Sequence, residues 1–293
     1  PENAKRLHEQ TGNWYKPGTI KLFPEPEALP YEKVSADTSI EIERLQVLAA
    51  MAGTGKNLPP LVIVSAQGLS QKLPSPQRFD KARQTIKAGA DVKPLDLLAQ
   101  WQAIGYRLED LVEVPGTMSR RGGSVDIYPT DGELPARLEF FGDNVESIRL
   151  FDPATQRSLR GVNSIDITPA SEKLAGETDA DDNLLSYLGC DGRLIIDEPD
   201  SISLAFDDLN KKAVELREES IAQGELPATS PRPYFIFEDI APCVASRQHL
   251  VFLASGADEE GLVTSFTPAP NYAGQMPAFV RKIKEMEGRG QRV

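Results

Sequence analysis

The glycine-rich segment Gly53-Thr-Gly-Lys-Asn57 is the first place where the residue types suggest chemistry. A phosphate-binding loop needs the pattern G-x-x-x-x-G-K-[ST], in which glycines let the backbone cradle phosphate and a hydroxyl reaches magnesium. Here Ala50 stands at the position of the first glycine, and Asn57 stands at the position of the hydroxyl. The segment also follows an expected helix, whereas a phosphate loop follows a strand. We therefore interpret it as a surface turn.

The run Ile195-Ile-Asp-Glu-Pro199 places two carboxylates, Asp197 and Glu198, at the end of an apolar strand pattern. ATPases hold magnesium and orient water with acidic residues at such strand ends. Without a phosphate loop the pair has no nucleotide to serve, which favours a vestigial ATPase pair over a working one. The remaining alternative is that Asp197 or Glu198 helps to start a helix near Pro199.

The stretch Ala136-Arg-Leu-Glu-Phe-Phe141 reads as a strand that ends in two adjacent phenylalanines. Successive side chains of a strand point to opposite faces. If Leu138 and Phe140 face a core, then Arg137, Glu139 and Phe141 face away from it. A large aromatic side chain beside an arginine on the outer face is either covered by another domain or available to a partner.

A second arginine-containing segment, Arg120-Arg-Gly-Gly123, has three interpretations: a phosphate-binding patch, a contact for an acidic partner, or an ordinary exposed turn. The ordinary turn is favoured unless Arg121 shares a sheet surface with Arg137 and Phe141. Residues 106–170 contain seven arginines and no lysine. Arginine forms fork-like pairs with carboxylates, for which lysine offers only a point charge.

Composition limits the class of protein. The chain has 293 residues, of which 40% are hydrophobic and 26% charged, and this suits a soluble globular protein of two or three domains. We find no signal peptide and no apolar run near the roughly 20 residues of a membrane span. The net charge of −12 argues against tight, non-specific nucleic-acid binding. The chain has two cysteines and two histidines, which are isolated from one another in the sequence: Cys190, Cys243, His8 and His249. We therefore expect neither a zinc site nor a disulfide framework, and a reducing cytoplasm fits this composition.

The periodicity of apolar residues divides the chain into three blocks. Residues 1–105 alternate helix and strand signals, with a capped helix from Thr38, a buried strand at 61–64 and a helix over 94–104 that Gly105 ends. Residues 106–170 read as a β-rich domain with a hairpin turn at 142–144. Residues 171–293 return to α/β, with strands at 193–196 and 250–253, helices over 201–223 and 276–287, and a last strand from Gln291. The fold class expected is α/β, with two α/β layers and an intervening β-rich α+β domain.

The central block resembles the module shared by bacterial UvrB and the transcription-repair coupling factors (Mfd). Five segments carry the resemblance, the last three of them more similar to the coupling factors: VPGTMSRRGGSVDIYP (114–129), ARLEFFGDNVESIRLFDPATQRSL (136–159), LFPEPEALPYE (22–32), LVIVSAQGLSQKLP (61–74) and ITPASE (167–172). UvrB also carries a working phosphate loop and an aromatic-rich β-hairpin that enters damaged DNA. This chain shows neither, and its seven tyrosines are scattered, so the coupling factors are the nearer family.

The resemblance implies the N-terminal part of a larger coupling factor, incomplete at its own N-terminus. Its fold would be two degenerate, helicase-derived RecA-like layers around a middle domain that binds UvrA, the first damage sensor of nucleotide excision repair. The motif positions that carry UvrA binding in the family correspond here to Arg121, Arg137 and Phe141, with Arg120 as an additional candidate. The family's RNA-polymerase-binding domain and ATP- and magnesium-dependent DNA translocase lie downstream. Its C-terminal domain is expected to mask the UvrA-binding surface.

Three functional hypotheses follow. The first is a catalytically inert, cytoplasmic bacterial adaptor that needs no cofactor and recruits UvrA to stalled RNA polymerase. The second is a UvrB-like ATPase and damaged-DNA-binding module. The third is a module that restrains the downstream motor, which is compatible with the first.

Overall fold

A computed structural model describes residues 2–16, 18–32, 38–52, 61–174, 182–189, 192–247, 249–252 and 276–289. The chain divides into two compact units, residues 1–252 and 253–293. The second unit contains α8 (Met276–Gly288), which confirms the helix predicted over 276–287. The predicted strand from Gln291 and the interpreted turn at Gly53–Asn57 lie outside the described residues. No helix in the described ranges has both the length and the apolar character that crossing a membrane requires.

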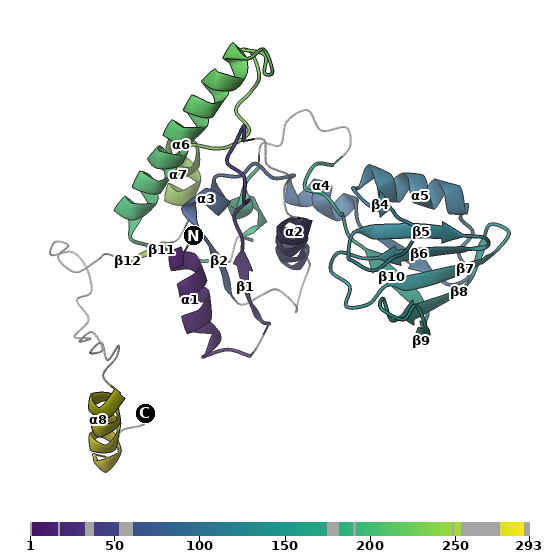
Figure 1. Ribbon diagram of the computed structural model, residues 1–293, viewed down its shortest axis with the longest axis horizontal. Coiled ribbons are helices and arrows are strands. Elements are labelled where there is room, and N and C mark those ends of the chain that lie inside the picture. The colour runs from purple at the N-terminus through teal and green to yellow at the C-terminus, as the bar shows by residue number, and fades with distance from the viewer. Residues whose placement is uncertain are drawn as a thin grey trace. The chain divides into compact units, whose positions relative to one another are not determined.

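A six-stranded sheet with the order β4-β5-β6-β7-β8-β9 forms the β-rich region (Figure 1). Neighbouring strands from β5 to β9 are antiparallel, and β4 is parallel to β5. The predicted hairpin is confirmed, with Gly142 in the turn at a φ of 62°. The strands are β4 (Arg107–Leu108), β5 (Thr117–Arg121), β6 (Ser124–Tyr128), β7 (Ala136–Phe141), β8 (Asn144–Phe151) and β9 (Ser158–Val162).

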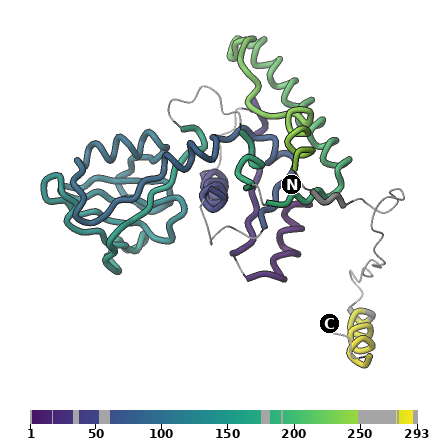
Figure 2. The backbone as a smooth tube through the Cα atoms, turned by 180° about the vertical axis from the view of Figure 1, so that it is seen from behind, coloured from purple at the N-terminus to yellow at the C-terminus, as the bar shows by residue number. Residues whose placement is uncertain are grey.

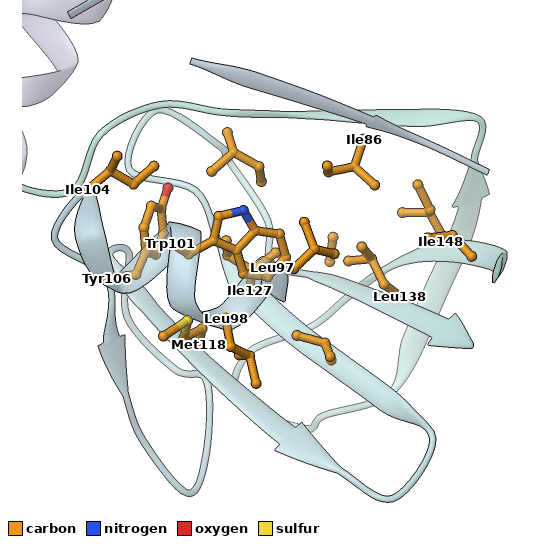
Figure 3. Packing of buried hydrophobic residues seen from close by; sticks show 14 residues of the cluster. Ile86, Leu97, Leu98, Trp101, Ile104, Tyr106, Met118, Ile127, Leu138 and Ile148 are labelled. Carbon is orange, nitrogen blue, oxygen red and sulfur yellow. The ribbon is translucent and has the colours of Figure 1, made fainter. Parts of the chain in front are cut away.

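Helix α5 (Pro94–Ala103) packs against one face of this sheet, which we call the inner face (Figure 3). Pro94 opens the helix, where the missing N–H of proline has no intrahelical partner to lose. Trp101 is fully buried, and its Nε1 donates a hydrogen bond to Oε1 of Gln84 at 3.2 Å. Helix and sheet share one hydrophobic core, whose members include Ile86, Leu97, Leu98, Trp101, Met118, Ile127, Leu138 and Ile148.

The core also takes in a two-stranded antiparallel sheet of β3 (Gln84–Lys87) and β10 (Ser164–Ile167). Residues 84–104 therefore share a core with the strands of the predicted β-rich domain. The predicted boundary between residues 105 and 106 falls inside this core, and the three domain limits stay predictions.

Gly105 ends α5 in a conformation that only glycine adopts easily, with a φ of +102°. A Cβ at this position would lie 2.6 Å from the backbone nitrogen of Ser171 and 2.8 Å from the carbonyl carbon of Ala170. We expect Gly105→Ala to lower the free energy of unfolding by about 1–3 kcal/mol, measured by urea denaturation. Gly89→Ala is the control, because its φ is also positive (+86°) but no atom lies within 4 Å of its added Cβ. Equal losses for the two variants would contradict the role of the close approach.

The first α/β part is built on a parallel pair of strands, β1 (Ile20–Phe23) and β2 (Leu61–Val64). Helix α2 (Thr38–Ala52) buries Leu45 and Leu48, so both the helix from Thr38 and the strand at 61–64 are confirmed. The remaining helices of this part are α1 (Glu2–Gly12), α3 (Ala66–Leu69) and α4 (Pro76–Lys81).

A second parallel pair joins β11 (Leu194–Asp197) to β12 (His249–Phe252). Helix α6 (Pro199–Ala222) follows β11 along the chain (Figure 2), and α7 (Phe237–Ala245) precedes β12. Leu185 of the short helix η1 (Leu184–Tyr187), Phe206 of α6 and Ile240 of α7 form a small core. These elements confirm the strands and the long helix that the sequence predicts, and the mixed α/β class is confirmed with them.

Arg44 connects α2 to the segment that follows the sheet. Its guanidinium donates from Nη2 to Oε2 of Glu172 at 3.0 Å, while Nε pairs with the other carboxylate oxygen. Nη1 donates to the carbonyl oxygen of Pro24 at 2.7 Å, and the guanidinium carbon lies 4.1 Å from the ring centre of Phe23. Arg44 is only 3% exposed, so this ion pair is shielded from water.

Candidate functional site

The strand register defines which side chains share the face of the sheet opposite α5, which we call the outer face. Cross-strand partners point to the same side of a sheet. Arg121 is paired with Ser124, and Ser124 with Glu139. Glu139 is two residues from both Arg137 and Phe141 on β7, so these residues alternate onto the same side. The outer face therefore carries Arg121, Arg137 and Phe141, as the adaptor hypothesis requires.

Arg120 lies on the other side. It is paired with Val125, which is paired with Leu138, and both of these belong to the inner-face core. Arg120 is nevertheless exposed, because it lies near the end of β5, whose last two residues are both exposed. The structure thus separates Arg120 from the three other candidate residues.

Phe141 is the most exposed large hydrophobic side chain among the described residues of this sheet, at 82%. Its neighbour Phe140 points inward and packs against the core. The turn that follows is tied to the 89–92 loop, since Val92 donates from its backbone nitrogen to the carbonyl of Asp143 at 2.7 Å. The side-chain amide of Asn144 donates to the carbonyl of Gly89 at 3.1 Å. The end of β7 is therefore held in place while the ring of Phe141 stays in solvent.

Arg137 is fixed by a buried carboxylate. Its Nε and Nη2 donate to the two oxygens of Asp126 at 2.8 and 2.7 Å, and Asp126 is only 3% exposed. The hydrogen bonding of Arg137 to the Asp126 carboxylate is the largest cause of the raised pKa of Arg137. The guanidinium carbon also lies 4.9 Å from the ring centre of Phe151. The side chain of Arg137 is 22% exposed, so part of it stays open to a partner.

Part of the outer face is covered by the segment between β4 and β5. Ser119 donates from Oγ to the carbonyl oxygen of Asp110 at 3.1 Å, and Gln156 donates from Nε2 to that of Val112 at 3.1 Å. Arg121 is exposed but donates from Nη2 to the same carbonyl of Asp110 at 2.6 Å. We call the part of the outer face that carries Arg121, Arg137 and Phe141 the outer-face corner, and the covering segment touches it at Arg121.

Sequence reasoning placed Glu139 on the outer face with Arg137 and Phe141, but it missed the polar partners of Glu139. Glu139 accepts a hydrogen bond from Oγ of Ser147, and it lies 3.5 Å from Nε of Arg149. Strand alternation is enough to predict that Glu139 shares a face with Phe141. The contact of Arg149 with Glu139 could not be predicted from the sequence, because β8 contains an additional residue opposite β7 between Ser147 and Val145.

Asp197 and Glu198 both lie at the exposed end of β11. Glu198 has a φ of 53°, in the left-handed region, and its carbonyl accepts from the backbone nitrogen of Ile202 at 3.1 Å. Its carboxylate accepts from Oγ of Ser201 at 3.1 Å, so Glu198 takes part in starting α6. Within the described ranges, no group of three or more acidic, histidine or cysteine residues could hold a metal ion.

Comparison with known proteins first assigns the region around the six-stranded sheet to a class of domain. The family model described as "UvrB interaction domain" matches residues 85–172, which begin within β3 and include α5, the whole six-stranded sheet and β10. The candidate corner lies inside the matched range.

Three curated relatives are more specific, and each of the three is a transcription-repair-coupling factor. The protein from Bacillus subtilis (strain 168) is 30% identical over 169 residues, which is 58% of this chain and 14% of the relative. The protein from Myxococcus xanthus is 36% identical over 163 residues, 56% of this chain and 13% of the relative. That from Haemophilus influenzae is 36% identical over 153 residues, 52% of this chain and 13% of the relative. These matches confirm the resemblance to an N-terminal coupling-factor module, and they span only a small part of each relative.

Proposed function

We propose that this chain is a non-catalytic adaptor module of a transcription-repair coupling factor that binds UvrA through the outer-face corner of its sheet. The observation that carries the proposal is the exposed ring of Phe141, held on a fixed hairpin end beside Arg121 and Arg137. The match of residues 85–172 to the UvrB interaction domain supports it. In the whole protein, this module would bring UvrA to stalled RNA polymerase, while a downstream ATP-dependent motor moves along DNA.

Physical chemistry supports a protein partner at this corner. Aromatic and arginine side chains dominate binding hot spots, where a truncation costs about 2 kcal/mol or more. Phe141 supplies apolar area, and the arginines supply charge-assisted hydrogen bonds to acidic groups. Because Asp126 orients Arg137 before a partner arrives, little side-chain entropy is lost on binding.

The finer parts of the proposal concern the fold and its regulation. The two parallel pairs, β1 with β2 and β11 with β12, support two degenerate RecA-like layers flanking the UvrA-binding domain. Asp197 and Glu198 would then be the remains of an ATPase site. A C-terminal domain of the whole protein would cover Phe141 until the protein engages RNA polymerase, which accounts for so large an exposed aromatic side chain.

Titration calorimetry of the chain with UvrA tests the proposal. We expect Phe141→Ala to weaken binding about thirtyfold, the equivalent of about 2 kcal/mol, without changing stability, since the ring packs on little. Leu108→Ala is the matched control, because Leu108 is also exposed (56%) but lies on the edge strand β4, which β5 and β6 separate from β7. Unchanged binding by Phe141→Ala would move the site elsewhere.

Arginine variants refine the test. Arg121→Ala removes an exposed side chain and is expected to weaken binding about tenfold. Arg137→Lys keeps the charge but loses the fork that grips Asp126, so its stability has to be measured together with its affinity. If the chain does not bind UvrA but binds ATP or damaged DNA, the UvrB-like ATPase hypothesis replaces the adaptor.

A further inference from the structure

The second feature of interest on this sheet is its last strand, β9. The sheet order ends at β9, so one edge of this strand has no neighbouring strand among the described residues. Four of its five residues are exposed, and Leu159 is 57% exposed. Alternate residues of an edge strand direct their N–H and C=O groups away from the sheet. β9 therefore offers backbone donors and acceptors to an added strand.

A hollow of about 580 Å³ lies beside this strand. It is lined by residues of β8 and β9 and by Ala88 and Asn163. Gly161 forms part of its wall, and a Cβ added there would meet nothing closer than the carbonyl oxygen of Ile148 at 3.8 Å. The absence of a side chain at Gly161 leaves room next to Arg149, its cross-strand partner.

The charges around the hollow are mainly positive. Arg149 and Arg160 line it, and Arg157 precedes β9. Neither Arg157 nor Arg160 forms an ion pair with another residue that the structure describes, whereas Arg149 shares Glu139 at 3.5 Å. Glu146 is the one acidic residue in the described lining. In a chain with a net charge of −12, such a group of arginines is a local exception.

We propose that the β9 edge binds an extended, acidic segment of a partner protein, which adds to the sheet as a seventh strand. Main-chain hydrogen bonds give affinity in this mode of recognition, and alternate side chains of the added strand give specificity. Carboxylates of the segment would pair with Arg160, whose cross-strand partner Leu150 packs against the inner-face core, and its apolar side chains would cover Leu159. The exposed backbone edge and Leu159 favour a peptide over nucleic acid, and Glu146 would repel a continuous line of phosphates.

The edge of β9 is separate from Arg121, Arg137 and Phe141, the three residues proposed to bind UvrA. Phe141 lies at the end of β7, and β8 stands between β7 and β9. The two proposals can therefore be tested independently. Phe141→Ala is expected to leave binding at the β9 edge unchanged, and variants at β9 test the edge alone.

The probe is an acetylated octapeptide that alternates glutamate and valine, titrated into the ¹⁵N-labelled chain. We expect chemical-shift changes centred on β9 and slower amide exchange at residues 158–162, because an added strand protects their outward N–H groups. Arg160→Glu should weaken binding tenfold or more. Arg107→Glu is the matched control, since it reverses an exposed arginine on β4 at the opposite edge, and should change affinity less than twofold.

Gly161→Glu gives a second variant that the fold accommodates, as its Cβ has room, and it should also weaken binding tenfold or more. Shift changes that map elsewhere, binding that persists in both β9 variants, or unprotected β9 amides would overturn the proposal. Tighter binding of an eight-nucleotide oligothymidylate at the same residues would also overturn it and assign the arginines to phosphate.

Discussion

Trp101→Ala is expected to lower the free energy of unfolding by about 3–5 kcal/mol, the range for removing a large aromatic side chain from a core. The substitution leaves a cavity in the core, because the Trp101 side chain is 0% exposed and packs with residues of both α5 and the sheet (Figure 3). Oε1 of Gln84 also loses its donor, which adds the cost of an unsatisfied polar group. Urea denaturation followed by circular dichroism measures the loss.

Leu95→Ala is the control for this experiment. Leu95 lies on the same helix, α5, but is 61% exposed, so its truncation is expected to change stability by about 0.5 kcal/mol or less. A loss of similar size for both variants would mean that α5 does not pack through Trp101. Because the outer-face corner is on the sheet that α5 supports, Trp101→Ala should also weaken partner binding, in proportion to the unfolded fraction.

The position of Phe141 could be predicted from sequence because β7 alternates without interruption. Phe140 packs on the core and Phe141 does not, as the apolar pattern of that strand alone indicates. The placement of Arg121 needed one more fact, the register of the β5–β6 hairpin. In that hairpin Arg121 is paired with Ser124, and a shift by one residue would have exchanged the faces of Arg120 and Arg121.

Other parts of the site could not be predicted, because they depend on pairs that are distant in sequence. Asp126 lies 11 residues before Arg137, and nothing in its local pattern indicates that it is buried beside a guanidinium. The irregular pairing of β7 with β8 hides the contact between Glu139 and Arg149. Helical periodicity likewise showed that α5 has a buried face, but not that this face packs on the sheet that follows.

The ion pair between Arg44 and Glu172 is expected to dominate the contact between α2 and the segment after the sheet. Arg44→Met should lower the free energy of unfolding by about 3–5 kcal/mol, because it leaves Glu172 charged and mostly buried without its partner. The side chains of Arg44 and Glu172 are 4% and 18% exposed. The carbonyl oxygen of Pro24 also loses a donor. Urea denaturation again provides the measurement.

A double-mutant cycle separates the pair from the packing around it. Arg44→Met combined with Glu172→Met should lose less stability than the sum of the single variants, because a buried ion pair replaced by apolar side chains leaves no unpaired charge. We expect a coupling energy of about 1.5–3 kcal/mol. The exposed pair Arg149–Glu139 is the control, with a coupling below about 1 kcal/mol, since its side chains are 50% and 40% exposed. Additive losses at Arg44 and Glu172 would mean that the ion pair contributes nothing to the contact between α2 and the segment after the sheet. Packing against Phe23 would then be what holds Arg44 in place.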